Sequence, residues 1–306
     1  MKKLEQVREQ KKQKDVVILA HYYADGDVQA AADYVGDSYA LARKATQVEQ
    51  KNILFCGVSF MGESAKLLNP DKNVYMAEPT ADCPMAHMAD LEKIARVRAE
   101  YPDVAVVCYV NSTAEIKAAS DVCVTSSNAV RIVKRLENQK IYFIPDQHLA
   151  RFVARQVPEK HFIFHDGFCP LHAQISKKDI VSAREKHPGL PVLTHPECPQ
   201  EVLDCSDFVG STAEIIAYAA ESEEKEFLIA TETGVFYELE RQNPGKTFYP
   251  VKECQICPDM KKNTIDQVLK VLESIGSDHE PEQVILPEKI MEDARKPLEE
   301  MLRLAK

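Results

Sequence analysis

Residues 16–38 read VVILAHYYADGDVQAAADYVGDS, and the rest of the chain repeats their plan. The apolar start indicates a buried strand, and the polar tip after it leads to a short helix. A second strand then runs into a helix that begins at Ser38. The helical pattern covers residues 28–35 and resumes over 38–47. This stretch predicts a unit in which strands and helices alternate.

The skeleton of this stretch occurs three times at a nearly constant interval. The first strands end at His21, Tyr109 and His195, which are 88 and 86 residues apart. An aspartate follows each of these positions by 12 residues, and a hydroxyl side chain follows the aspartate by five. A fixed period of this length indicates an internal triplication. The aspartates are Asp33, Asp121 and Asp207, and the hydroxyl residues are Ser38, Ser126 and Thr212.

Continuous apolar strands alternate with helical segments along the whole chain. This pattern is typical of parallel sheets that helices cover on both faces. We predict an α/β protein of three similar αβα sandwich units with parallel sheets, in a pseudo-threefold triangular arrangement. The units span residues 1–86, 87–172 and 173–257, and we expect two amphipathic helices in 258–306 to pack on the first unit.

Composition narrows the class of protein. The 306 residues are 45% hydrophobic and 28% charged, as expected for a globular protein. The net charge of −10 disfavours non-specific binding to nucleic acid. No apolar run approaches the roughly 18 residues of a membrane span, and the charged helix predicted over residues 3–14 lacks the apolar core of a signal peptide. We expect a cytoplasmic protein without nucleic-acid or membrane partners.

Polar side chains follow the first strand of every unit. Ligands of open parallel sheets bind beyond the carboxyl ends of the strands, so we expect these residues to line one site. A lone histidine at a strand end is more often structural, but equivalent positions in three copies favour a shared site. The three segments are His21-Tyr22-Tyr23, Tyr109-Val110-Asn111 and His195-Pro196-Glu197.

The hydroxyl residues Ser38, Ser126 and Thr212 fall at predicted helix starts. One interpretation is that they are helix N-caps. The N-terminus of a helix also attracts anions. Three such termini around a pseudo-threefold axis supply the local positive potential that an acidic chain otherwise lacks. The sequence therefore predicts an anion site, and it does not assign a carboxylate or a phosphate to any one hydroxyl.

Three of the nine cysteines keep the register of the repeat. Cys83, Cys169 and Cys257 are 86 and 88 residues apart, and a proline follows each. An odd number of cysteines in a reducing compartment favours metal binding or reactive thiols over disulfides. Three convergent thiolates suit a [4Fe–4S] cluster with one open iron. Zinc with a fourth ligand is one alternative, and buried inert thiols are another.

Cys254 competes with Cys257 for the third position in this pattern. Only Cys257 precedes a proline, and its 45-residue distance from Thr212 equals the distance from Ser38 to Cys83. The register therefore selects Cys257. The remaining cysteines lie within apolar strands or out of register, and none is expected to bind metal: Cys56, Cys108, Cys123, Cys198 and Cys205.

With these motifs the chain resembles the quinolinate synthases, iron–sulfur enzymes of de novo NAD synthesis. The similarity covers nearly the whole chain, with segments such as ILAHYY, DYVGDS, GVSFMGESAKLLNP, YVNSTAEIKA, VTSSNAV, FCPLH, THPEC and CPDMKKNT. It implies that iminosuccinate condenses with dihydroxyacetone phosphate to give quinolinate, phosphate and two waters. It also implies a [4Fe–4S] cluster whose open iron acts as a Lewis acid, and L-aspartate oxidase as the source of iminosuccinate.

The resemblance also implies roles for individual residues. The cluster ligands are Cys83, Cys169 and Cys257. The acid–base residues are Tyr23, His21, His195, Glu197 and His172. The substrate contacts are His21, Ser38, Tyr109, Val110, Asn111, Ser126, His195, Pro196, Glu197 and Thr212. Two alternatives stay open: a cluster-dependent hydro-lyase acting on another dicarboxylate, and a non-catalytic iron–sulfur sensor.

Overall fold

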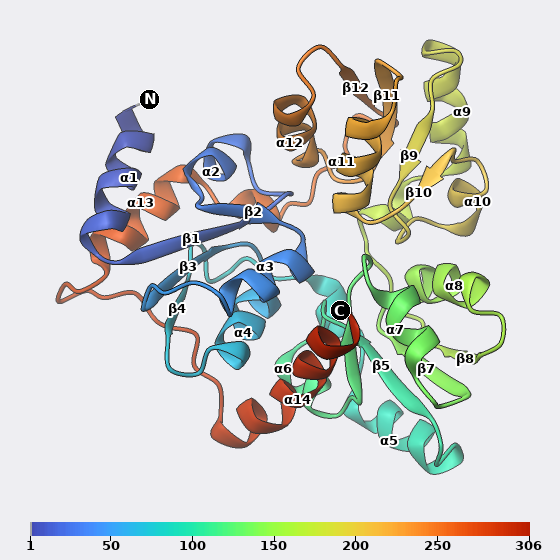
Figure 1. Ribbon diagram of the computed structural model, residues 1–306, viewed down its shortest axis with the longest axis horizontal. Helices are drawn as coiled ribbons and strands as arrows, with labels where there is room; N and C mark the ends of the chain where they lie inside the picture. The colour runs from blue at the N-terminus through green and yellow to red at the C-terminus, as the bar shows by residue number, and fades with distance from the viewer. Residues whose placement is uncertain (1) are drawn as a thin grey trace.

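The computed structural model describes residues 2–306 and contains three four-stranded sheets with the same strand order. In each sheet the first strand lies between the second and the third, and the fourth is at the edge. Every strand pair is parallel. The three sheets and their helices form three lobes around a common centre (Figure 1). The prediction of an α/β protein with three similar αβα units is confirmed.

Each unit supplies four strands and the helices between them. The first contains α1 (Lys2–Gln13), β1 (Val16–His21), α2 (Gly26–Ala31), β2 (Tyr34–Gly36), α3 (Ser38–Ala45), β3 (Asn52–Cys56), α4 (Ser59–Leu68) and β4 (Asn73–Met76). The second contains α5 (Leu91–Glu100), β5 (Ala105–Tyr109), α6 (Ala114–Ala118), β6 (Val122–Val124), α7 (Ala129–Arg135), β7 (Lys140–Ile144), α8 (Gln147–Gln156) and β8 (His161–Phe164). The third contains α9 (Lys177–Lys186), β9 (Val192–Thr194), α10 (Gln200–Leu203), β10 (Phe208–Val209), α11 (Thr212–Glu221), β11 (Glu226–Ala230), α12 (Val235–Gln242) and β12 (Thr247–Pro250).

The helix in the opening stretch is shorter than its pattern predicts. α2 ends at Ala31, and Tyr34 and Val35 belong to β2. Asp33 gives the physical reason. Its backbone amide donates to the carbonyl of Ile18 and its carboxylate accepts the amide of Ile18, both at 2.9 Å. These two bonds draw the chain into the sheet, so the helical prediction for residues 32–35 was wrong.

The recurring aspartates make the same contacts in all three units. Each carboxylate accepts the backbone amide of the residue 15 positions earlier, at 2.7–2.9 Å. Each also pairs with a basic side chain on the helix before the first strand, at 2.7–3.0 Å. The aspartates therefore fasten the second strand and the preceding helix to the first strand. The three sets are Asp33 with Ile18 and Lys11, Asp121 with Val106 and Arg98, and Asp207 with Val192 and Arg184.

The hydrophobic core is continuous between the first two units. One buried cluster includes Phe55 of the first unit, Phe143 of the second and Leu298 of the C-terminal helix. The third unit instead buries separate clusters on the two faces of its own sheet. The third unit therefore shares the least apolar packing with the other two units.

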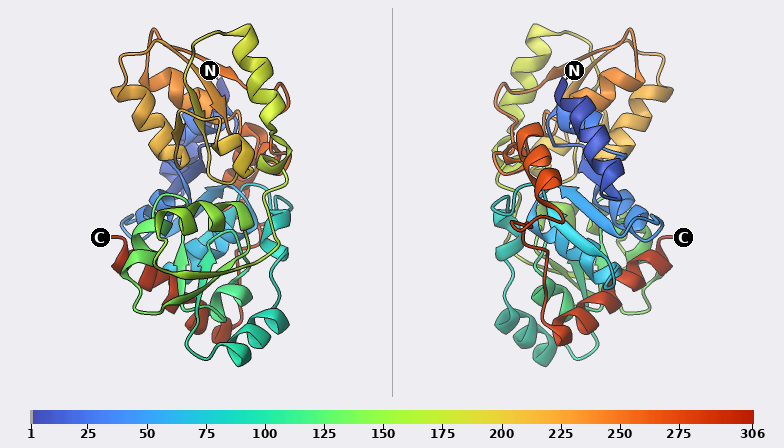
Figure 2. Two further views of the ribbon diagram at one scale, coloured as in Figure 1. Left: turned by 90° about the vertical axis from the view of Figure 1, so that its right-hand side faces the viewer. Right: turned by 90° about the vertical axis from the view of Figure 1, so that its left-hand side faces the viewer.

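The last two helices pack in different places. α13 (Ile265–Ser274) contacts α1 and α2 of the first unit, and α1 and α13 lie side by side in the right-hand view of Figure 2. α14 (Glu288–Leu304) contacts α4 of the first unit and α6 and β6 of the second. The unit boundaries at residues 86, 172 and 257 stay a prediction. Among residues 2–306, none of the helices combines the length and apolar character needed to cross a membrane.

Candidate active site

A cavity of about 150 Å³ lies where the three units meet at the carboxyl ends of their strands. This is the place where parallel sheets bind ligands. The side chains of Val110 and Pro196 are buried but do not line it, and their assignment as substrate contacts stays a prediction. The other predicted site residues all line its wall: His21, Tyr23, Ser38, Cys83, Tyr109, Asn111, Ser126, Cys169, His172, His195, Glu197, Thr212 and Cys257.

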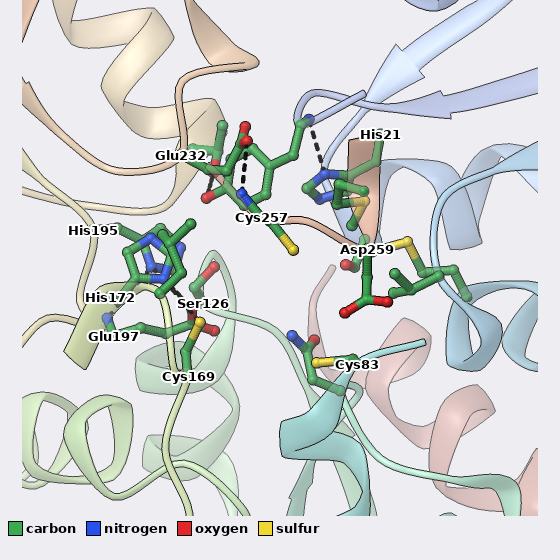
Figure 3. Close-up of a pocket in the computed structure, with 18 of the residues that line it drawn as sticks. His21, Cys83, Ser126, Cys169, His172, His195, Glu197, Glu232, Cys257 and Asp259 are labelled. Carbon is green, nitrogen blue, oxygen red and sulfur yellow. Dashed lines mark hydrogen bonds and ion pairs between the residues drawn. The ribbon is translucent and has the colours of Figure 1, made fainter. Parts of the chain in front are cut away.

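The three cysteines in register come from equivalent loops. Each lies in a Cys-Pro turn that runs into a short 3₁₀ helix: η1 (Pro84–His87), η2 (His172–Gln174) or η3 (Met260–Lys262). Their sulfur atoms point into the same open space (Figure 3). Cys254 is exposed and lines a different surface groove beside Lys186 and Tyr249. The core positions predicted for Cys56, Cys108 and Cys123 are confirmed, because all three are fully buried.

The cysteine triad fits a metal cluster better than a single zinc ion. Burial raises the pKa of Cys83 to about 12 and also raises the pKa of Cys169 and Cys257. Thiols in such a place ionise when a bound cation compensates the charge. Zinc needs sulfur atoms roughly 3.8 Å apart, given Zn–S bonds of about 2.3 Å in a tetrahedron. Within residues 2–306, the one group of ligand atoms lying within 4.8 Å of one another is Cys169, His172 and Glu197, not the three thiols. A cluster tolerates wider spacing, because each thiolate binds a different iron.

Two histidines occupy matching positions in the first and third units. Nδ1 of His21 accepts the backbone amide of Tyr23 at 3.1 Å, and Nδ1 of His195 accepts that of Glu197 at 3.3 Å. Burial lowers the pKa of both histidines to about 3. Both rings are therefore neutral at ordinary pH, and Nε2 carries the proton because Nδ1 is an acceptor.

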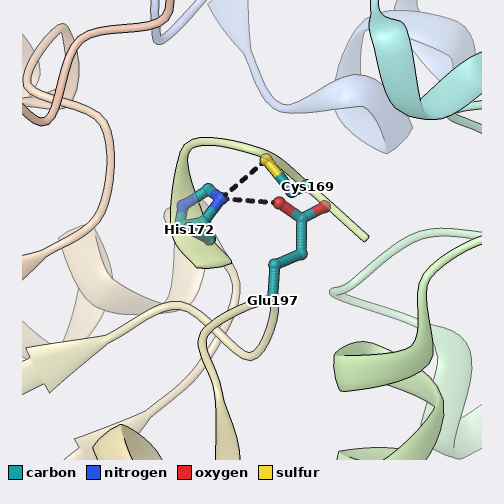
Figure 4. A group of neighbouring side chains, drawn as sticks. All are labelled: Cys169, His172 and Glu197. Atoms are coloured by element: carbon teal, nitrogen blue, oxygen red, sulfur yellow. Dashed lines mark hydrogen bonds and ion pairs between the residues drawn. The ribbon is translucent and has the colours of Figure 1, made fainter. Parts of the chain in front are cut away.

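A chain of hydrogen bonds joins Tyr23 to Glu197 through residues of the second and third units. The hydroxyl of Tyr23 lies 2.8 Å from Oγ1 of Thr231, which lies 2.9 Å from Nε2 of His172. Nδ1 of the same ring lies 2.7 Å from Oε2 of Glu197 and 3.2 Å from Sγ of Cys169 (Figure 4). Thr231, His172 and Glu197 are buried, and Tyr23 is partly buried. We call these four residues, Tyr23, Thr231, His172 and Glu197, the relay.

The two ends of the relay have opposite proton affinities. Burial raises the pKa of Tyr23 well above its usual value, and the charge of Glu197 adds to the effect. Burial also acts to raise the pKa of Glu197, but His195 and the hydrogen bond from His172 outweigh it and leave the pKa below its usual value. Tyr23 is therefore a protonated donor and Glu197 an ionised acceptor. These are the protonation states that a proton donor and a proton acceptor need at ordinary pH.

The hydroxyl residues are not helix caps, so that interpretation was wrong. Asp37 caps α3 and Ser211 caps α11, which leaves Ser38 and Thr212 at the first helical positions. Ser126 lies in the loop before Asn128, the residue at the start of α7. Because Asp37 does the capping, the hydroxyl of Ser38 remains available to the cavity beside a helix N-terminus. Oγ1 of Thr212 instead lies 2.9 Å from the hydroxyl of Tyr23.

Several residues of the site follow the third strand of a unit, and the sequence analysis predicted no site residue at these positions. Thr231 and Glu232 follow β11, and Asp146 follows β7. Thr231 and Glu232 are fully buried, and Glu232 lines the cavity. The rule that ligands lie beyond strand ends applies to the third strand as well as the first. The 86-residue interval between Asp146 and Glu232 was a usable signal.

Fold and cavity together define a class, the three-unit α/β proteins whose single site draws on every unit. The profile of the family described as "Quinolinate synthetase A protein" matches residues 5–303. The quinolinate synthase of Caldicellulosiruptor bescii is 48% identical over 294 residues, which are 96% of this chain and 95% of the relative. That of Clostridioides difficile is 44% identical over 300 residues, 98% of this chain and 97% of the relative. The chain belongs to the quinolinate synthase family.

Proposed function

We propose that this chain is a quinolinate synthase that condenses iminosuccinate with dihydroxyacetone phosphate and releases phosphate and two waters. The observation that carries the proposal is one cavity, built by three units, that holds the relay, the anion-binding helix ends and the three cysteines in register. Membership of the family names the substrates. The product of an L-aspartate oxidase is the expected source of iminosuccinate.

Cys83, Cys169 and Cys257 hold a [4Fe–4S] cluster in this proposal. When bound, the cluster supplies a Lewis acid for a hydroxyl or carboxylate oxygen of the substrate. Cys257 is the third ligand and Cys254 is not, because Cys254 is exposed and lines a different groove. A Cys254→Ala variant should hold about four irons after anaerobic reconstitution and stay active, whereas Cys257→Ala should do neither.

The relay moves the protons of the isomerisation and dehydration steps. Glu197 removes a proton from the substrate, and Tyr23 donates one at the opposite end. His172 and Thr231 return the proton from Glu197 to Tyr23 through adjacent hydrogen bonds, so that both groups regain their starting state. Nε2–H of His21 and of His195 supply neutral hydrogen-bond donors to substrate oxygens.

The anionic groups of the substrates bind at the helix ends. Ser38 and Thr212 stand at the N-termini of α3 and α11, where the backbone amides and the helix dipole favour negative charge. Two buried acceptors of the cavity, Oε1 of Glu197 and Oδ1 of Asn111, have no partner among residues 2–306. Buried polar atoms are normally paired, so these two point to hydrogen-bond donors on the substrate.

The decisive test is product formation by anaerobically reconstituted protein. Iminosuccinate, generated in the assay from oxaloacetate and ammonia, and dihydroxyacetone phosphate should give quinolinate, identified by mass. Chelator-treated protein should give none. Quinolinate formation at an equal rate without iron would overturn the cofactor assignment. No quinolinate from protein with a full cluster would overturn the reaction, and dehydration of another dicarboxylate by that protein would identify a hydro-lyase. Protein that holds a cluster but shows neither activity would favour the alternative of a non-catalytic iron–sulfur sensor.

A further inference from the structure

The backbone amide of each cavity cysteine donates to a carboxylate. The amide of Cys83 lies 2.8 Å from Oδ1 of Asp82. The amide of Cys169 lies 3.0 Å from Oδ2 of Asp146, and that of Cys257 lies 3.1 Å from Oε1 of Glu232. The contact recurs in all three units at the residue that anchors each sulfur. We call Asp82, Asp146 and Glu232 the clamp carboxylates.

Two clamp carboxylates join a strand end to a cysteine loop. Asp146 and Glu232 are fully buried and follow β7 and β11. Each uses its second oxygen for another amide, that of Leu149 at 2.6 Å and that of Gly234 at 2.5 Å. Because both oxygens are engaged, each side chain fixes the position of the cysteine amide relative to the sheet.

The first unit makes the same contact from a different position. Val58 stands where the 88-residue interval places the counterpart of Asp146, and it has no carboxylate. Asp82, the residue immediately before Cys83, makes the contact and is held in turn by the hydroxyl of Ser59 and by Nε2 of His87, the latter at 2.6 Å. The units therefore share the contact and not the position. An inherited repeat alone does not account for a contact that is rebuilt from another residue.

Helix capping does not explain the three contacts either. Asp146 caps α8 with the oxygen that accepts the amide of Leu149. Glu232 caps no helix, because α12 begins after Gly234 without a side-chain cap, and η1 also lacks one. What the three carboxylates have in common is the amide of a cysteine.

We propose that the clamp carboxylates are positioning residues for the cluster, an inference that rests on the proposed cofactor. They hold each cysteine loop in the ligand-binding conformation, which lowers the entropy that binding has to overcome. They also place negative charge beside the cysteines, which disfavours the addition of an electron and so lowers the reduction potential of a cluster. The clamps therefore favour both retention of the cluster and a low potential.

The isosteric variants Asp146→Asn and Glu232→Gln test this proposal. The amide oxygen of each replacement keeps one acceptor, for Leu149 or Gly234, while its NH₂ group faces a cysteine amide that also donates. Asp82→Ala removes the acceptor of the Cys83 amide on a half-exposed side chain, where folding is least at risk. Asp90→Asn is the matched control, because Asp90 caps α5 through the amide of Lys93 at 2.6 Å and contacts no cysteine.

Three measurements are made on the full chain after anaerobic reconstitution: iron and sulfide content, the half-time of cluster loss to a chelator, and the midpoint potential from an EPR-monitored titration. We expect the clamp variants to lose the cluster roughly 10–100-fold faster than wild type and to have more positive potentials. Asp90→Asn should match wild type. Half-times within about twofold of wild type and unchanged potentials in folded clamp variants would overturn the proposal.

Two further outcomes separate this inference from the cofactor assignment on which it rests. Wild-type protein that takes up no iron and sulfide would contradict the cofactor itself. Wild-type protein that holds a cluster, alongside clamp variants with identical clusters, would contradict the clamps alone. If Asp146→Asn or Glu232→Gln fails to fold by circular dichroism, the half-exposed Asp82→Ala variant decides the question.

Discussion

At the scale of single residues, Thr231 is the one link between the two ends of the relay. Its hydroxyl contacts both Tyr23 and His172, and valine has nearly the same shape without the oxygen. We expect Thr231→Val to lower kcat roughly 100-fold, the lower end of the effect of a general acid or base. Thr231→Ser should recover most of the activity, and iron content should not change in either variant.

The control for this prediction is another buried threonine of the same unit. Thr194 is fully buried, bonds to Ser206 at 2.6 Å and does not line the cavity. Thr194→Val should leave kcat near that of wild type. A Thr231→Val variant that also stays within twofold of wild type would show that protons reach Tyr23 by another route.

The neutral histidines make the cluster-free protein sensitive to acid. The pKa of His21 and of His195 is about 3 in the folded chain and near 6.5 when unfolded. Between these values the unfolded chain binds more protons, so the free energy of unfolding falls as pH falls below about 6.5. At pH 5 the loss approaches about 2 kcal/mol for each ring.

Urea unfolding of cluster-free protein at pH 7 and pH 5 measures this loss. His195→Gln should show a smaller difference between the two pH values than wild type, because one titrating group is gone. His161→Asn, at an exposed position of β8, should behave as wild type. An equal pH dependence in wild type and His195→Gln would contradict the assignment of a neutral buried ring.

At the scale of secondary-structure elements, the recurring aspartates hold each unit together. Asp121 accepts the amide of Val106 at 2.7 Å and pairs with Arg98 at 3.0 Å, which joins β5, β6 and α5. We expect Asp121→Ala to lower the free energy of unfolding by about 1–2 kcal/mol, because a strand amide loses its acceptor. Chemical denaturation measures the loss. Asp103→Ala, which removes an exposed pair with Lys140, should have no measurable effect.

At the scale of the whole molecule, the cavity connects the third unit to two units with which it shares little apolar packing. The third unit has its own hydrophobic clusters and meets the first unit partly through polar contacts. One of these is Lys261, which donates to the carbonyl of Tyr23 at 2.9 Å and pairs with Glu232 at 3.3 Å. A ligand held by all three units would add the connection that the core does not provide.

We therefore expect cluster loading to stabilise the chain as a whole. A ligand that binds only the folded state raises the melting temperature. Chelation should lower Tm and speed amide exchange in all three cysteine loops, at residues 83–87, 169–174 and 257–262. The Cys83→Ala variant should not respond to the chelator. A change confined to one loop would contradict a cluster shared by three units.

The sequence by itself determined the repeat, the class of fold and most of the cavity wall. The 88- and 86-residue intervals placed His21, Tyr109 and His195 at matching strand ends, and the same intervals selected Cys257 over Cys254. The strand ends meet at one cavity because a repeated unit puts equivalent residues at equivalent places, and because strand ends of parallel sheets face one edge. The choice of Cys257 as the third ligand stays a prediction.

Only the tertiary structure decided which residues touch across units. Thr231 links Tyr23 to His172 over separations of 208 and 59 residues, and no local pattern encodes such a contact. The contacts of Asp146 with Cys169 and of Glu232 with Cys257 span 23 and 25 residues, and the repeat did not predict them either. The helix caps are also one residue away from the expected hydroxyl groups: Asp37 caps α3 and Ser211 caps α11. Which of two adjacent polar residues becomes the cap depends on the backbone conformation at the start of the helix. The period of the sequence predicts which residues occupy equivalent positions in the three units. The contacts between units depend instead on how the three units pack against one another.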